Sequence, residues 1–90
     1  MHTEHITFTL GEALIHLQSL VSDLRDNRLG SDDAPELSVE LGHILDHICD
    51  AWNTREMTSE EIAARSQEEF ERHTDTVPNF QGSRTLGDYA

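Results

Sequence analysis

Lysine is absent from this chain of 90 residues, and its six basic side chains are all arginine. Eighteen aspartate and glutamate residues oppose them, which gives a formal net charge of −12 with the histidines neutral. Proteins that bind nucleic acids neutralise phosphate groups with clustered cations, and anionic membrane surfaces attract the same kind of cluster. The charge balance therefore argues against nucleic acid and against a membrane as binding partners.

The acidic residues are spread along the whole sequence and form no long block. Three explanations of this acidity stay open: a partner with a basic surface, mimicry of a polyanion such as a nucleic acid, and a general solubility device of a salt-adapted protein. The first two explanations concern function, whereas the third concerns only the source.

Cysteine and long apolar runs are also scarce. Cys49 is the only cysteine, which excludes a disulfide within the chain and is expected of a reducing compartment. We expect it to be a structural thiol at the margin of the core. No stretch approaches the roughly 18 apolar residues of a membrane span, and the N-terminus lacks the pattern of a signal peptide. These observations predict a soluble, cytoplasmic protein.

Motifs of catalysis are missing from the sequence as well. It has no glycine-rich phosphate loop, no nucleophile elbow and no zinc-protease motif. This favours a protein that is not an enzyme, and we expect no cofactor apart from a transition metal.

The apolar content is low for a self-sufficient domain, at 36% of the residues with only 6% aromatic. A domain of about 90 residues buries only about 60–65% of the surface that its unfolded chain exposes. A second subunit, either another copy or a different protein, would supply burial that the monomer lacks. We therefore expect a homo-oligomer or a protein partner.

Apolar residues recur at helical spacing in residues 10–28 and 35–53, with a short connection between them in which Gly30 would form a left-handed helix cap. This pattern predicts an antiparallel helical hairpin. A shorter third helix is predicted over residues 59–73, opened by a capping box of Thr58 and Glu61. The fold class is all-α, and two hairpins could pair into a four-helix bundle by dimerisation. The residues expected to pair within the hairpin are Leu10, Ala13, Leu14, Leu17, Leu20, Val21 and Leu24 with Leu37, Leu41, Ile44, Leu45, Ile48 and Trp52.

Both ends of the chain are expected to be extended arms around a three-helix domain at residues 10–73. In the N-terminal arm, residues 1–9, the alternation that continues into Leu10 is typical of a strand, and a capping box of Thr9 and Glu12 would then start the first helix. The tail, residues 74–90, contains proline and glycine, yet its apolar side chains are regularly spaced. We expect it to lie across a groove of its own hairpin or of another chain. The candidate interface residues are Trp52, Val77, Phe80, Leu86 and Tyr89.

Residues 40–52, ELGHILDHICDAW, carry histidines and acids on one flank of the second predicted helix. His43 and His47 are one turn apart, which lets two imidazoles bind one transition metal. Glu40 precedes His43 with the Glu-x-x-His spacing that di-iron four-helix bundles use. The chain has only one such match, so it shares the motif and not the whole ligand set. The candidate metal ligands are Glu40, His43 and His47, for iron, zinc or manganese.

Two other interpretations of this flank stay open. The histidines could become cationic near about pH 6 and adjust the contact with a partner. Alternatively, Glu40, Asp46 and Asp50 pair with neighbouring side chains on a solvated flank. His16 of the first predicted helix falls opposite the apolar stripe, so we expect it to face water.

The sequence thus favours a small acidic, non-catalytic interaction or accessory protein that works through helical contacts and its C-terminal tail. A transition-metal-binding helical protein is the alternative from a different class. A polyanion mimic is the third hypothesis.

Overall fold

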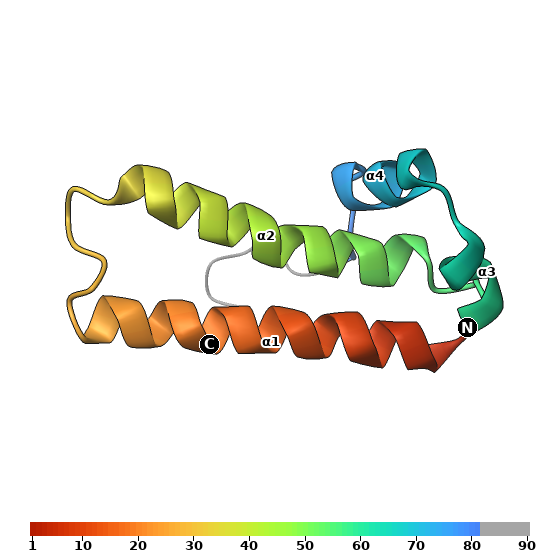
Figure 1. Cartoon of the computed structure of the whole chain (residues 1–90), viewed down its shortest axis with the longest axis horizontal. Coiled ribbons are helices and arrows are strands. Elements are labelled where there is room, and N and C mark those ends of the chain that lie inside the picture. The colour runs from red at the N-terminus through yellow and green to blue at the C-terminus, as the bar shows by residue number, and fades with distance from the viewer. Residues whose placement is uncertain (82–90) are drawn as a thin grey trace.

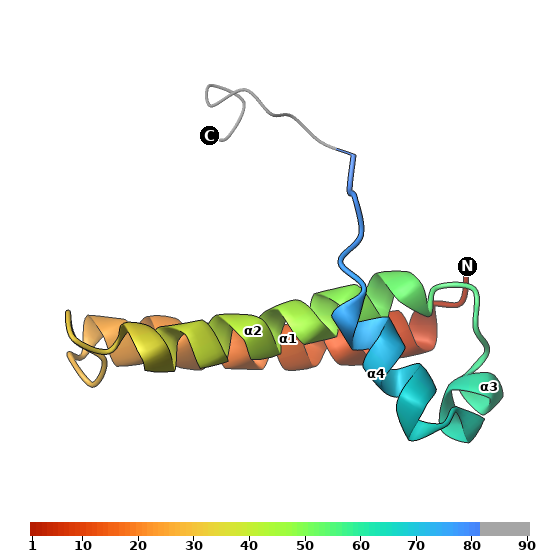
Figure 2. The ribbon, with the colours of Figure 1, turned by 90° about the horizontal axis from the view of Figure 1, so that it is seen from above.

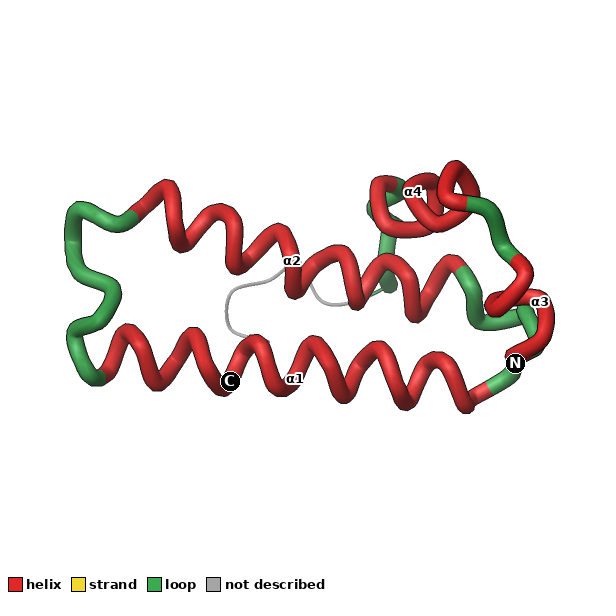
Figure 3. Tube along the Cα trace, in the orientation of Figure 1, coloured by secondary structure: helices red, strands yellow, loops and turns green. Residues whose placement is uncertain are grey.

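The computed structural model of the chain describes residues 1–81, and the regular structure in that range is entirely helical. Its helices are α1 (Thr3–Arg25), α2 (Ala34–Asn53), α3 (Ser59–Ala64) and α4 (Gln67–Asp75). The two long helices, α1 and α2, run antiparallel side by side, and the two short helices lie at the end where α1 begins (Figures 1 and 3). The predicted all-α fold with a helical hairpin is confirmed. None of the described helices is long and apolar enough to cross a membrane.

The apolar part of the contact between α1 and α2 is made by few buried side chains, and these are small or branched. Ala13 and Leu20 of α1 pack with Ile44 of α2, and partly buried apolar residues surround this cluster. Those surrounding residues are Leu29, Leu37 and Ile48. The core between the helices is therefore thin, and most leucines of the hairpin lie outside it.

Cys49 is fully buried on α2, deeper than the margin position that the sequence predicted. Burial raises the pKa of its thiol, and the nearby Asp46 carboxylate raises it further. Both effects disfavour the reactive thiolate, which fits a structural role.

The N-terminal residues differ from the prediction, because residues 3–9 form the first turns of α1 and not an extended arm. Ile6 and Leu10 are four residues apart and so share a helix face, while Phe8 points away and is 64% exposed. The predicted capping box is also wrong, because Thr9 lies inside the helix and is buried. Its hydroxyl contacts α2, so tertiary packing outweighs the strand-like alternation.

The turn after α1 also differs in detail from the prediction. The left-handed residue is Asn27, with φ at 59°, and Gly30 has an ordinary backbone. Asn tolerates this conformation better than most residues, because its short polar side chain can bond locally. The amide of Gly30 instead donates to the Asp33 carboxylate at 2.7 Å, which closes the turn before α2.

The third predicted helix is split into α3 and α4. The predicted capping box is confirmed: the Thr58 hydroxyl accepts from the Glu61 amide, and the Glu61 carboxylate accepts from the Thr58 amide. Arg65 then leaves the helical conformation, and the Ser66 hydroxyl accepts from the amide of Glu69 to start α4. The break aims the Arg65 side chain at α2, where it pairs with a buried carboxylate.

Candidate functional site

Eight large apolar side chains form one exposed surface of the hairpin, which we call the leucine face. Their exposed fractions run from 41% to 54%. The leucine face consists of Leu10, Leu14, Leu17, Val21 and Leu24 of α1 with Leu41, Leu45 and Trp52 of α2. The sequence predicted that these residues would be buried between the two helices, and the structure leaves them half exposed.

The reason is the side on which α1 meets α2. Thr9, Ala13 and Leu20 are buried, and on a helical wheel they lie about 80° from the stripe of leucines. The helices therefore touch through the edge of each apolar stripe. One shallow pocket joins the two halves of the leucine face, since Leu10 of α1 and Trp52 of α2 both line it.

The leucine face contains two grooves, and neither is lined by an acidic side chain. One groove runs along α1, and the other bridges α1 and α2, with Arg25 beside the first and Arg55 beside the second. No aspartate or glutamate lines either groove, although the chain contains 18 of them. Within these two grooves, therefore, no carboxylate interrupts the apolar surface.

The start of the C-terminal tail reaches one end of the leucine face. Asn53 donates from its side-chain amide to the carbonyl oxygens of His73 and Thr76, both at 2.8 Å. The chain then crosses to the side opposite α3 and α4 (Figure 2). There the Phe80 ring meets the Trp52 ring edge-on, with centroids 5.5 Å apart.

These contacts involve two of the five predicted interface residues. Trp52 and Phe80 come together, and each is 44% exposed, while Val77 is 64% exposed. The guanidinium of Arg55 also lies 3.9 Å from the centre of the Trp52 ring system. Leu86 and Tyr89 lie outside the described residues.

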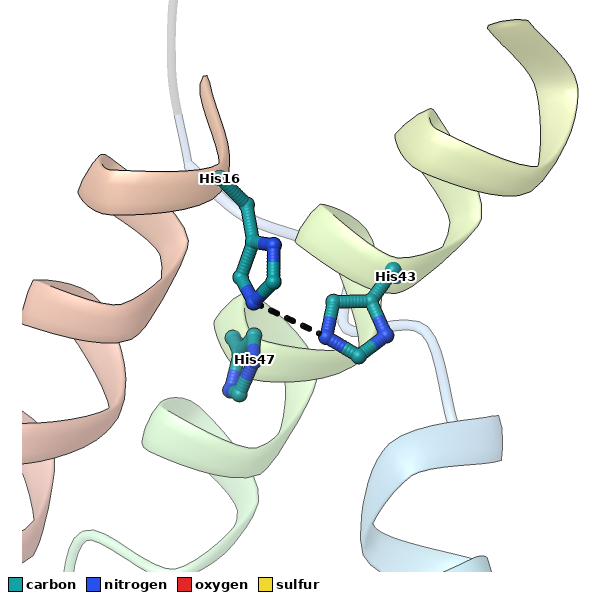
Figure 4. Close-up of side chains that lie close together, drawn as sticks. All are labelled: His16, His43 and His47. Atoms are coloured by element: carbon teal, nitrogen blue, oxygen red, sulfur yellow. Dashed lines mark hydrogen bonds between the residues drawn. The ribbon is translucent and has the colours of Figure 1, made fainter. Parts of the chain in front are cut away.

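A cluster of three histidines lies on the other side of the hairpin. His16 comes from α1, and His43 and His47 come from α2 (Figure 4). One ring nitrogen from each can be chosen so that all three lie within 4.8 Å of one another. The Nε2 atoms of His16 and His43 are 3.1 Å apart, and the rings of His43 and His47 meet edge-on.

The side chain of Thr9 on α1 contacts His47 through hydrogen bonds. The Thr9 hydroxyl oxygen lies 2.9 Å from Nδ1 of His47 and donates to the carbonyl oxygen of the same residue at 3.4 Å. Burial lowers the pKa of His47, and the charges of His43 and His16 lower it further, against opposing effects of Glu12 and Asp50. The site therefore favours a neutral His47 imidazole.

A cleft beside the cluster is lined by α1, α2 and α4. His43 and His47 form one part of its wall, and His5, Asp50 and Arg65 form another. Asp50 accepts hydrogen bonds from Nε2 of His5 at 2.7 Å and from both terminal nitrogens of Arg65 at 2.6 and 3.1 Å. One interpretation of the sequence placed Asp50 on a solvated flank, but Arg65 and α4 cover this carboxylate, and Asp50 is only 4% exposed.

Of the predicted metal ligands, the structure brings His43 and His47 together and leaves Glu40 outside the group. His16 takes part in its place, because α2 packs on the side of α1 that carries it and leaves it half buried. The register of the predicted hairpin could have indicated that His16 belongs to the cluster. When the two helices are paired about their short loop, His16 lies opposite the helical turn that carries His43 and His47.

No protein-family model matches this chain, and no curated protein or solved structure matches it either. Function is therefore inferred from the geometry of the leucine face and of the histidine cluster.

Proposed function

We propose that this chain is a small acidic interaction protein whose working form is a dimer, in which the leucine faces of two hairpins pack into a four-helix bundle. The observation that carries this proposal is the exposure of eight large apolar side chains along both long helices. In contrast, the buried apolar residues are few and include two alanines: Ala13, Leu20, Ile44, Cys49 and Ala51.

The exposed area is large enough to matter for assembly. Burying a leucine side chain completely contributes about 1.5–3 kcal/mol, so covering a half-exposed one contributes roughly 1 kcal/mol. A contiguous apolar surface of this kind on a small helical protein marks an interaction site. The hydrophobic gain from both faces together opposes the loss of freedom on association.

The spacing of the leucine face favours a second copy as the occupant. On α1 its residues follow one another at intervals of three and four, which is the pattern that packs against a neighbouring helix at a shallow angle. An up-and-down hairpin with such a face on both helices is self-complementary, because a twofold rotation places each apolar stripe against its counterpart. The result has the layers of a four-helix bundle.

The charge distribution agrees with this arrangement. Each chain carries a net charge of −12, which would oppose self-association if acidic groups stood on the contact surface. The grooves of the leucine face lack them, so the carboxylates of a dimer stay on its outer surface. Trp52 and Phe80 lie at one end of the face, where they contribute aromatic contact area.

A pair of substitutions on α1 tests the proposal. Leu14→Gln places a polar group on the leucine face, whereas Ile15→Gln alters the next residue, which is 59% exposed and about 100° away around the helix. Each substitution replaces an apolar side chain of the same size at a similarly exposed position. We expect Leu14→Gln to weaken the dimer at least tenfold, measured by sedimentation equilibrium, and Ile15→Gln to leave it unchanged. Equal effects of the two substitutions, or no effect of Leu14→Gln, would contradict the proposed interface.

A further inference from the structure

We propose that His16, His43 and His47 form a binding site for one divalent transition-metal ion of the zinc class, with three imidazole ligands and a fourth position open to the cleft. The site is on the side of the hairpin away from the leucine face and does not depend on dimerisation. It differs from the ligand set that the sequence suggested, since His16 joins from α1 in place of Glu40.

The spacing of the donor atoms is close to what zinc requires. Zinc binds histidine nitrogen at about 2.0–2.1 Å, so two nitrogens of a tetrahedral site are about 3.3 Å apart. The Nε2 atoms of His16 and His43 already lie 3.1 Å apart. All three donors lie within 4.8 Å of one another, so closing the set requires shifts of at most about 1.5 Å, which small side-chain rotations supply.

Rigid elements hold the three rings. His43 and His47 are one turn apart on α2, and His16 faces them from the adjacent part of α1 (Figure 4). The two helices are fixed against each other close by, where Leu20 of α1 packs with Ile44 of α2. Ligands on packed helices keep their geometry better than ligands on loops, because backbone motion there is small.

Thr9 sets the tautomer of His47 that a metal needs. Its hydroxyl donates to the His47 carbonyl oxygen, so its oxygen is available to accept from a protonated Nδ1 of the same residue. With the proton on Nδ1, the lone pair of the ring stays on Nε2. Metal-binding histidines in proteins are usually oriented in this way by a partner on the second ring nitrogen. Thr9 is only 2% exposed, so this partner is held firmly.

The surroundings also suit a cation with exchangeable ligands. Three imidazoles repel one another when protonated, and the neutral form is the one that binds metal. Glu12 and Asp50 place negative potential at His47 without lying among the three nitrogen donors. His43 is exposed and lines the cleft, so a water molecule or a small anionic ligand can reach the fourth position. An all-imidazole set prefers zinc and its neighbours to magnesium or calcium.

Titration of the full-length, untagged chain with Zn²⁺ tests the site, with Co²⁺ as the spectroscopic probe. We expect one ion per chain by calorimetry and the visible absorption bands of a tetrahedral cobalt centre with nitrogen ligands. His16→Gln and His43→Gln should each weaken binding at least tenfold, while His2→Gln, which alters an exposed histidine outside the cluster, should change nothing. His43 is the most exposed of the three ligands, so its variant tests the site even if His16→Gln impairs folding by circular dichroism.

Two further comparisons separate this ligand set from others. Thr9→Val should weaken Zn²⁺ binding by about 10-fold or more, and Thr9→Ser, which keeps the hydroxyl, should restore it. Glu40→Gln should leave the affinity unchanged. The proposal is overturned if the chain shows no saturable binding of Zn²⁺ or Co²⁺. It is also overturned if Glu40→Gln abolishes binding while His16→Gln preserves it.

Discussion

Asp50 and Arg65 form a two-pronged ion pair that joins the α3–α4 junction to α2. The two terminal guanidinium nitrogens of Arg65, Nη1 and Nη2, donate to the two carboxylate oxygens of Asp50, at 2.6 and 3.1 Å. Burial acts to raise the pKa of Asp50, but the hydrogen bonds from Arg65 and His5 outweigh it and hold the pKa below its usual value. The pair is therefore charged at neutral pH and fixes α4 beside the histidine cluster.

Removing the arginine should destabilise the fold strongly. In Arg65→Ala the Asp50 carboxylate stays buried without its main partner, and breaking a buried pair in this way costs about 3–5 kcal/mol. The check is the free energy of unfolding from urea titration at one fixed protein concentration. Arg72→Ala changes an exposed arginine of α4 and should stay within about 0.5 kcal/mol of the unmodified chain. Equal losses of unfolding free energy in the two variants would show that the ion pair does not stabilise the fold.

Stability should fall as the pH drops below about 6.5. Burial lowers the pKa of His73 from its ordinary 6.5, and the charge of Arg65, which donates to its Nδ1 at 3.0 Å, lowers it further. The unfolded chain therefore takes up the proton first, so unfolding is favoured as the pH falls through 6.5 until the folded pKa is passed. Asp50, whose folded pKa is also lowered, adds a further loss at more acidic pH.

The variant His73→Gln isolates the contribution of that residue. Glutamine retains an acceptor for Arg65 but does not titrate, so the dependence of melting temperature on pH between 7.5 and 5.5 should become shallower. His2→Gln, at the exposed N-terminus, should keep the original slope. An unchanged slope in His73→Gln would assign the acid sensitivity to other groups.

Cys49 should react slowly with thiol reagents in the folded chain. Its side chain is fully buried, and burial raises the pKa of the thiol, so both access and thiolate fraction are low. The rate of colour development with an aromatic disulfide reagent measures this, and we expect it to rise by at least 10-fold in denaturing urea. Equal rates in the two conditions would mean that the α2 segment around Cys49 opens readily.

Local signals in the sequence predicted the parts of the fold that depend on local physics. The start of α2 follows from Pro35 in its first turn, and its end follows from the polar residues after Asn53. The start of α3 follows from the capping box of Thr58. Ser66 and Glu69 have the same spacing as Thr58 and Glu61, so the start of α4 was also readable, and the prediction of one continuous helix overlooked it.

The remaining features depend on which faces of α1 and α2 meet. Ile6, Phe8 and Leu10 fit a strand as well as a helix, and the contacts of Thr9 with His47 and of His5 with Asp50 favour the helix. The same choice of face leaves the leucines exposed and brings His16 to the cluster. A helical wheel of one helix cannot show which of its faces is buried, because the wheel does not contain the position of the neighbouring helix.

The mass of the unmodified chain in solution, followed over a range of concentrations, tests the central claim most directly. One chain has a mass of 10.2 kDa. Light scattering coupled to size exclusion should give twice this value at high concentration, with dissociation towards one chain on dilution and a loss of stability that accompanies it. A mass of one chain at every concentration, together with unchanged stability, would contradict the pairing of two leucine faces.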